Sequence, residues 1–73
     1  LKYKTMKEFS KRLKELRLDR KLTQIDVASA VGVSYGIISK WENSKRQPTL
    51  ENIKSLSLFF NVSSDYLIGL SDY

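Results

Sequence analysis

Apolar residues recur along the chain at the three- and four-residue spacing of an amphipathic helix. Near the N-terminus the apolar stripe consists of Phe9, Leu13 and Leu16, and lysines lie away from it. Thr5 and Glu8 have the spacing of a capping box, in which a hydroxyl and a carboxylate satisfy free backbone groups at a helix start. These positions predict a first helix over residues 5–19.

A second helix is predicted to begin at Thr23, because Thr23 and Asp26 repeat the capping-box spacing. The apolar face behind this start consists of Val27, Ala28 and Val31. Gly32 follows, and glycine readily adopts the left-handed conformation that ends a helix. The second helix is therefore expected to stop at a tight turn.

A third helix is expected directly after this turn, with Ser34 as its cap. Its inward residues are Ile38 and Trp41, and Trp41 is expected in the core rather than stacked on a base. Residues 43–48, which follow the helix, are polar and end in a proline, so they are expected to form a loop. Two short helices joined by a glycine turn predict a helix-turn-helix unit.

The C-terminal third predicts two more helices. The first begins at Thr49, and its apolar stripe consists of Leu50, Ile53, Leu56 and Phe60. The second is short, with Ser63 as its cap and Gly69 at its end. No stretch has the alternation of a strand. We therefore expect an all-α fold, a compact five-helix bundle in which helices 2 and 3 form the helix-turn-helix.

The 73 residues are enough for one domain, which we place over residues 1–73. The chain starts with leucine, and Met6 is a candidate initiator. Residues 1–5 are therefore predicted to be an added or flexible arm, and residues 70–73 a tail. No apolar run approaches the roughly 20 residues that cross a membrane, so we expect a cytoplasmic protein without a membrane partner.

Composition limits the chemistry. The chain has no cysteine and no histidine, which excludes disulfides and the usual zinc sites and disfavours acid–base catalysis. We expect no enzyme activity, no cofactor, no metal and no small-molecule substrate. The net charge is +5, from 13 Lys and Arg against 8 Asp and Glu, and the cations concentrate in the first 21 residues. This charge suits a polyanionic partner, or it only solubilises an exposed helix.

Several motifs together resemble the phage-repressor and Cro type of helix-turn-helix domain, the XRE family. They are Leu-Thr-Gln at 22–24, Gly-Val-Ser at 32–34, Ile-Ser-Lys-Trp-Glu-Asn at 38–43, Pro-Thr-Leu-Glu-Asn at 48–52, and the segment from Asn61 to Gly69. The resemblance covers about residues 6–70. It implies a recognition helix in the DNA major groove, formed by the third predicted helix.

The resemblance also implies roles for single residues. The base-contacting positions would be Ser34, Tyr35, Gly36, Ser39 and Lys40. Lysine at such a position can donate to guanine, whereas glycine would only admit close approach. The phosphate-contacting positions would be Gln24, Asn43, Lys45 and Arg46. Arg17 and Glu42 would form an internal ion pair rather than contact DNA.

Two residues in and just after the third predicted helix depart from the family's pattern. Gly36 lies inside the recognition helix, where glycine costs about 1 kcal/mol relative to alanine; it is either an adaptation to DNA or drift. Ser44 stands where the family often has glycine, so the geometry of that turn is open.

Leu58 and Phe59 are also departures, because each is larger or more apolar than the residue that the family usually has there. With Leu70 and Tyr73 they form either a dimer surface or isolated exposed residues.

The expected function is a transcriptional regulator, of the repressor type, that binds double-stranded DNA as a homodimer on a palindromic operator. Its half-sites would lie about 34–36 Å apart. The alternative is a protein-interaction module, such as an antitoxin or an accessory subunit, which these apolar residues would serve.

Overall fold

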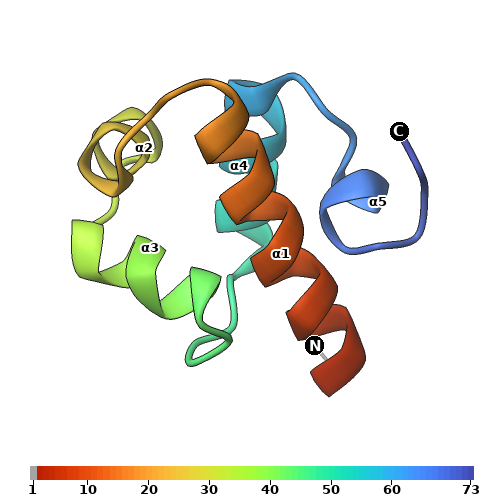
Figure 1. Ribbon diagram of the computed structural model, residues 1–73. Coiled ribbons are helices and arrows are strands. Elements are labelled where there is room, and N and C mark those ends of the chain that lie inside the picture. The colour runs from red at the N-terminus through yellow and green to blue at the C-terminus, as the bar shows by residue number, and fades with distance from the viewer. Residues whose placement is uncertain (1) are drawn as a thin grey trace.

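The computed structural model describes residues 2–73, and within that range it contains five helices and no strand (Figure 1). They are α1 (Tyr3–Asp19), α2 (Gln24–Val31), α3 (Tyr35–Glu42), α4 (Leu50–Phe60) and α5 (Ser64–Leu67). The long α1 packs against α3 on one side and α5 on the other, and α4 contacts both α2 and α5. The all-α, five-helix prediction is confirmed.

Hydroxyl side chains begin three of the helices. Thr23 accepts a hydrogen bond from the Asp26 amide at 3.0 Å, and Thr49 accepts one from the Asn52 amide at 3.1 Å. In both capping boxes the side chain of the third helical residue accepts a bond from the threonine amide in return. Ser63 caps α5 with a single hydrogen bond, which its hydroxyl accepts from the Tyr66 amide at 3.0 Å. The sequence therefore located these three starts correctly.

The predicted start of the first helix is wrong. The helix begins at Tyr3 after the extended residue Lys2, and no side chain caps it. Thr5 lies inside the helix, so residues 3–5 are not a flexible arm, and Leu1 lies outside the described residues. Met6 is buried in this helix, and its amide donates to the Lys2 carbonyl at 2.9 Å. The capping pattern at Thr5 is therefore not used.

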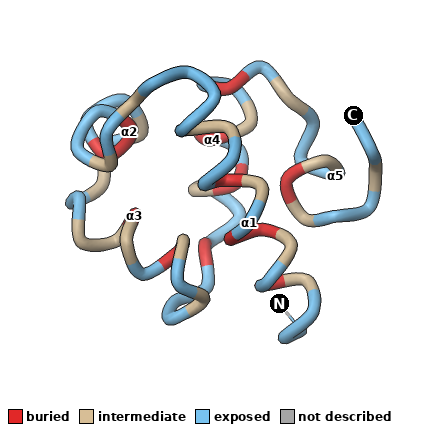
Figure 2. Tube along the Cα trace, viewed as in Figure 1, coloured by how far each residue is buried: buried red, intermediate tan, exposed pale blue. Residues whose placement is uncertain are grey.

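The core forms where the helices face one another (Figure 2). Its buried residues are Phe9, Leu13, Val27, Ala28, Ile38, Trp41, Ile53, Leu56, Phe60 and Leu67. Phe9 and Trp41 meet edge to face with ring centroids 6.0 Å apart. Trp41 is a core residue, as predicted. Leu50, the first residue of α4, is not a core residue, because it is 85% exposed.

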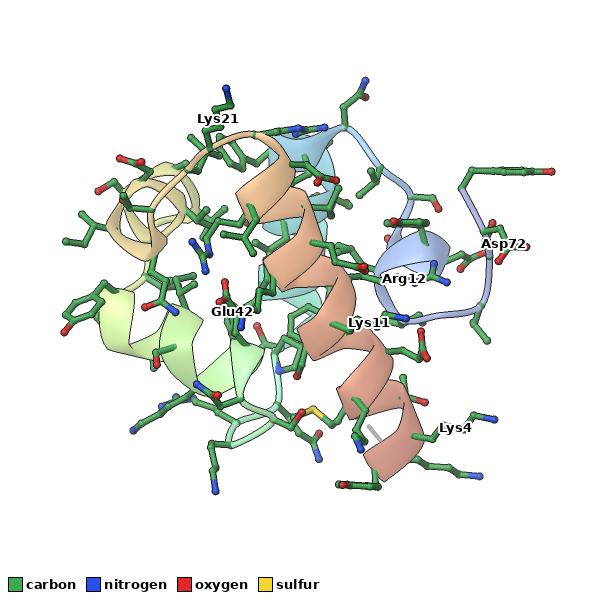
Figure 3. All side chains as sticks on the ribbon, in the orientation of Figure 1. Lys4, Lys11, Arg12, Lys21, Glu42 and Asp72 are labelled. Atoms are coloured by element: carbon green, nitrogen blue, oxygen red, sulfur yellow. The ribbon has the colours of Figure 1, made fainter. Side chains whose placement is uncertain are left out.

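The C-terminal segment is fastened to α1 by Arg12 (Figure 3). Its guanidinium lies 4.3 Å from the Tyr66 ring centroid and donates to the carbonyls of Tyr66 and Ser71. Gly69 has φ +86°, and a Cβ there would meet the Glu8 side chain at 2.8 Å. Within the predicted tail, the Ser71 carbonyl is thus bonded to the first helix, whereas Leu70 and Tyr73 are exposed. None of the helices described for residues 2–73 is long and apolar enough to cross a membrane.

Candidate nucleic-acid interface

The turn between α2 and α3 is built on Gly32, which has φ +75°. A Cβ at Gly32 would meet nothing, so only the left-handed backbone requires glycine there. Val27 and Ala28 anchor α2 in the core, and Ile38 and Trp41 anchor α3. The two helices are thus held as one unit, as the sequence predicted.

The side of α3 opposite its buried residues faces solvent. At about 100° per residue, Tyr35, Gly36, Ser39 and Lys40 lie away from Ile38 and Trp41. Tyr35 is 59% exposed and Lys40 is exposed. Ser34, the residue before α3, is also exposed, and its hydroxyl makes no capping bond to the helix. The structure therefore brings the five predicted base-contacting residues to one accessible surface.

Gly36 is not required by the fold. Its φ is not positive, and a Cβ built on it would meet nothing within 4 Å. Alanine would fit the free protein and would favour the helix. The packing of this chain therefore gives no reason for glycine at position 36.

The basic side chains near α3 carry charge that the protein does not neutralise. The ion pairs among the described residues are Arg12 with Glu8 and Arg17 with Glu42. Lys40, Lys45 and Arg46 take part in neither and are exposed. Positive charge without an internal partner is what attracts a polyanion. This end of the molecule is therefore suited to phosphate groups.

Asn43, a predicted phosphate contact, is tied to the end of α3. Its Nδ2 donates to the Ser39 carbonyl at 2.8 Å and lies 3.5 Å from the Ser39 hydroxyl. The amide nitrogen has a second N–H for an external acceptor. The side chain is thus positioned by the helix that it follows.

Arg17 and Glu42 form the predicted ion pair, with two hydrogen bonds between the side chains. Arg17 Nε lies 2.7 Å from Oε2 of Glu42, and Arg17 Nη2 lies 3.0 Å from Oε1. The side chains are 11% and 3% exposed, which places the pair inside the molecule. The hydrogen bonds that Arg17 donates to the Glu42 carboxylate raise the pKa of Arg17 above its ordinary value. The pair joins α1 to the end of α3.

Gln24 shares the same carboxylate, which the sequence did not indicate. Its Nε2 donates to Oε1 of Glu42 at 3.2 Å. The first residue of α2 is therefore also held against α3. No local pattern signals this bond, because the two residues are 18 positions apart and meet only after folding.

Ser10 is a second residue that the sequence analysis missed. It is buried, donates to the Trp41 carbonyl, and its hydroxyl oxygen lies 2.8 Å from that of Ser44. Ser44 has φ +56°, a conformation in which glycine is usual. Serine at position 44 therefore adopts the same left-handed turn as the glycine that the family often has there, and its side chain also contacts Ser10 on α1. A serine on an otherwise apolar helix face was the available signal.

Residues 13–67 match the family model described as helix-turn-helix. The chain belongs to the helix-turn-helix family. This helix-turn-helix domain is 43% identical over 62 residues to the HTH-type transcriptional activator BcrR of Enterococcus faecalis, covering 85% of the chain. It is 39% identical over 57 residues to repressor protein C2 of Salmonella phage P22, covering 78% of the chain. The chain spans only 30% and 26% of the lengths of these relatives.

A solved structure supports the same family. The helix-turn-helix domain superposes on the restriction-modification controller protein C.AhdI from Aeromonas hydrophila with a TM-score of 0.81 and 28% sequence identity. The match covers 89% of this chain and 98% of the controller protein. The relatives are named as regulators and not as enzymes, so the comparisons favour the regulatory expectation over the protein-interaction alternative.

Proposed function

We propose that the chain is the sequence-specific DNA-binding domain of a transcriptional regulator, with α3 in the major groove. The observation that carries the proposal is the accessible side of α3, where Tyr35 and Lys40 face solvent beside unneutralised cations. An α-helix with its side chains is about 10–12 Å across, and the major groove, about 12 Å wide, admits it. The regulators among the chain's relatives support the same function.

In this proposal the base edges are read by Ser34, Tyr35, Gly36, Ser39 and Lys40. Lys40 donates to guanine O6 and N7, the commonest specific contact of a basic side chain. Tyr35 packs on a thymine methyl group or reaches a phosphate, and Ser34 and Ser39 exchange hydrogen bonds with bases. Gly36 lets the DNA approach the helix backbone closely.

The phosphates are held by Gln24, Asn43, Lys45 and Arg46. Gln24 lies at the start of α2, where free backbone N–H groups and the helix dipole favour an anion. Its bond to Glu42 fixes the amide before DNA arrives, which leaves one N–H for a phosphate oxygen. Lys45 and Arg46 contribute charge from the loop after α3. These contacts set the position of the domain without reading sequence.

We further propose that two copies bind a palindromic operator in the cytoplasm and repress transcription. Support for a dimer comes from Leu58, which is 72% exposed on α4, and from the exposed Leu70 and Tyr73. Leu58→Glu should therefore reduce binding to a two-half-site operator while a single half-site is bound as before. Equal binding to both DNAs by the variant and the wild type would contradict the dimer surface.

The experiment that tests the function is selection of bound sequences from a random pool of DNA duplexes. A two-fold symmetric consensus is expected, and binding to it should weaken steeply as salt is raised. The selected site is then placed across a promoter in a reporter strain, where expression should fall. Recovery of the pool without sequence enrichment would refute sequence-specific binding.

A further inference from the structure

A hollow of about 350 Å³ lies beyond the C-terminal end of α3, between the first turn of α1 and the following loop. We call it the α1–loop hollow. Its lining residues are Tyr3, Met6, Ser44, Lys45, Arg46 and Gln47. The helix-turn-helix unit itself supplies none of them, because α2 and α3 end before Ser44. The hollow is therefore a feature of α1 and the loop together.

Two cations line this hollow, and a third lies against one of its lining residues. Lys45 and Arg46 line it, and Lys7 lies with its Nζ 5.4 Å from the centroid of the Tyr3 ring. None of them takes part in the ion pairs found among the described residues. Tyr3 is 73% exposed, so its hydroxyl is accessible as a donor. Clustered charge beside a hydroxyl donor is suited to a phosphate group.

A second hollow, of about 400 Å³, lies at the opposite end of α3. It is lined by Thr23 and Gln24 from the start of α2 and by Tyr35 from the start of α3, among others. The two hollows thus bracket a helix about 12 Å long. Sugar-phosphate backbones border the major groove on both sides. With α3 in the groove, the elements at both ends of the helix therefore lie near backbone phosphates.

We propose that the α1–loop hollow binds a backbone phosphate of double-stranded DNA, with the Tyr3 hydroxyl donating to it and Lys7 supplying charge. The first turn of α1 is then part of the DNA-binding surface. This inference rests on the proposed function, because it names a further contact of the same complex. It assigns a use to residues that sequence analysis placed in an added or flexible arm or on a solvated helix face.

Lys4, in the same turn of α1, provides a matched control. Lys4 has the charge of Lys7 and lies in the same part of α1, but it lines a different hollow with Gly69 and Leu70. Figure 3 shows Lys4 projecting away from α3. A general attraction between DNA and a positive helix would not distinguish the two lysines. A phosphate in the α1–loop hollow would distinguish them, because it would interact with Lys7 and not with Lys4.

The test compares Lys7→Ala, Tyr3→Phe and Lys4→Ala on the DNA site selected by the wild-type chain, with thermal unfolding as a check on folding. Lys7→Ala should weaken binding to specific and random duplexes alike, by about threefold to tenfold at low salt, and lower the salt slope by about one. Tyr3→Phe should weaken binding to both duplexes without changing the slope. Lys4→Ala should leave the slope unchanged.

The bound phosphate can also be identified directly. Single phosphates in the site are replaced one at a time by neutral methylphosphonates. One replacement outside the base pairs read by α3 should weaken the wild type but not Lys7→Ala. Equal losses for Lys7→Ala and Lys4→Ala, or no phosphate that depends on Lys7, would overturn the inference while leaving the proposed function intact. Failure of the wild type to bind any duplex would overturn both.

Discussion

Gln24 and Arg17 donate to the same oxygen of Glu42, at 3.2 Å and 3.0 Å. One carboxylate therefore links α1, the start of α2 and the end of α3. The two helices of the helix-turn-helix are fixed relative to each other at their polar ends as well as through the core. The proposed phosphate contact at Gln24 and the proposed base contacts on α3 are consequently held in one rigid arrangement.

The first prediction concerns this carboxylate. Glu42→Ala should destabilise the fold by about 2–4 kcal/mol, because the largely buried Arg17 loses its partner. The double variant Arg17→Met, Glu42→Met should recover most of the loss, since apolar replacement of a buried pair is often neutral. Urea unfolding of the three proteins measures both effects. A Glu42→Ala protein as stable as the wild type would show that the pair contributes nothing.

The second prediction separates two reasons for Gly36. Gly36→Ala should raise the stability by about 0.5–1 kcal/mol, because the site is open and helical. The same change should weaken binding to the selected operator if the DNA approaches the helix backbone there. Thermal unfolding and binding titrations measure the two effects on one protein. Unchanged affinity would mean that glycine at this position is drift.

Gly32→Ala serves as the control for this comparison. Gly32 has φ +75°, so alanine there is strained and should lower the stability by about 1–2 kcal/mol. The two glycines of the helix-turn-helix should thus respond in opposite directions to the same substitution. A gain in stability at both positions would contradict the turn geometry.

The third prediction separates base-contacting residues from phosphate-contacting residues. Lys40→Ala should cost about 1–3 kcal/mol of binding on the preferred site and relax the preference at one base pair. Arg46→Ala should weaken binding to all sequences alike and lower the salt slope by about one. Titrations of specific and random DNA at several salt concentrations measure both. Lys54→Ala on α4 is the control for lost charge, and equal effects of Lys40→Ala on both DNAs would reject the assignment of roles.

The fourth prediction is a pH dependence at the start of α2. The hydrogen bond from the Thr23 amide lowers the pKa of Asp26 below its ordinary value. A lowered folded-state pKa stabilises the protein above the unfolded pKa of about 3.9. This contribution is lost as the pH falls through the folded-state pKa. Carboxyl NMR titration should therefore show Asp26 protonating below the ordinary aspartate pKa of about 3.9.

Asp26→Asn provides the matched variant, because Asn52 forms the same capping box in α4 without charge. The variant should keep the helix start, and the difference in stability between it and the wild type should shrink as the pH falls below about 4. A difference that stays constant from neutral to acid pH would show that the ionisation of Asp26 is not linked to folding.

The elements that the sequence predicted best are those set by local chemistry. Thr23, Thr49 and Ser63 each carry an oxygen that satisfies backbone amides within three residues, and Gly32 adopts the turn that glycine favours. The same local logic failed at Thr5, because the backbone is already helical from Tyr3 and the Met6 amide bonds the Lys2 carbonyl. It also failed at Leu50, since an apolar periodicity does not show where the neighbouring helix ends.

The candidate site was predictable in part. The exposure of Tyr35 and Lys40 followed from the spacing of Ile38 and Trp41, and the contact of Arg17 with Glu42 came from the family resemblance. The bonds that position the site were not predictable. Gln24 with Glu42 and Ser10 with Ser44 join residues far apart in the chain, and their side chains have no local pattern that selects one partner over another.

Left-handed residues follow α2 and α3, Gly32 ahead of α3 and Ser44 behind it. The chain changes direction at these two residues, and Ser44 is also hydrogen-bonded to Ser10. These two reversals of the chain fix both the length of α3 and its rotation about its own axis. One inserted residue would turn the remainder of the helix by about 100° and carry Lys40 toward the core. Relatives with new DNA preferences should therefore differ in which side chains occupy this helix, while the number of residues between the two reversals stays constant.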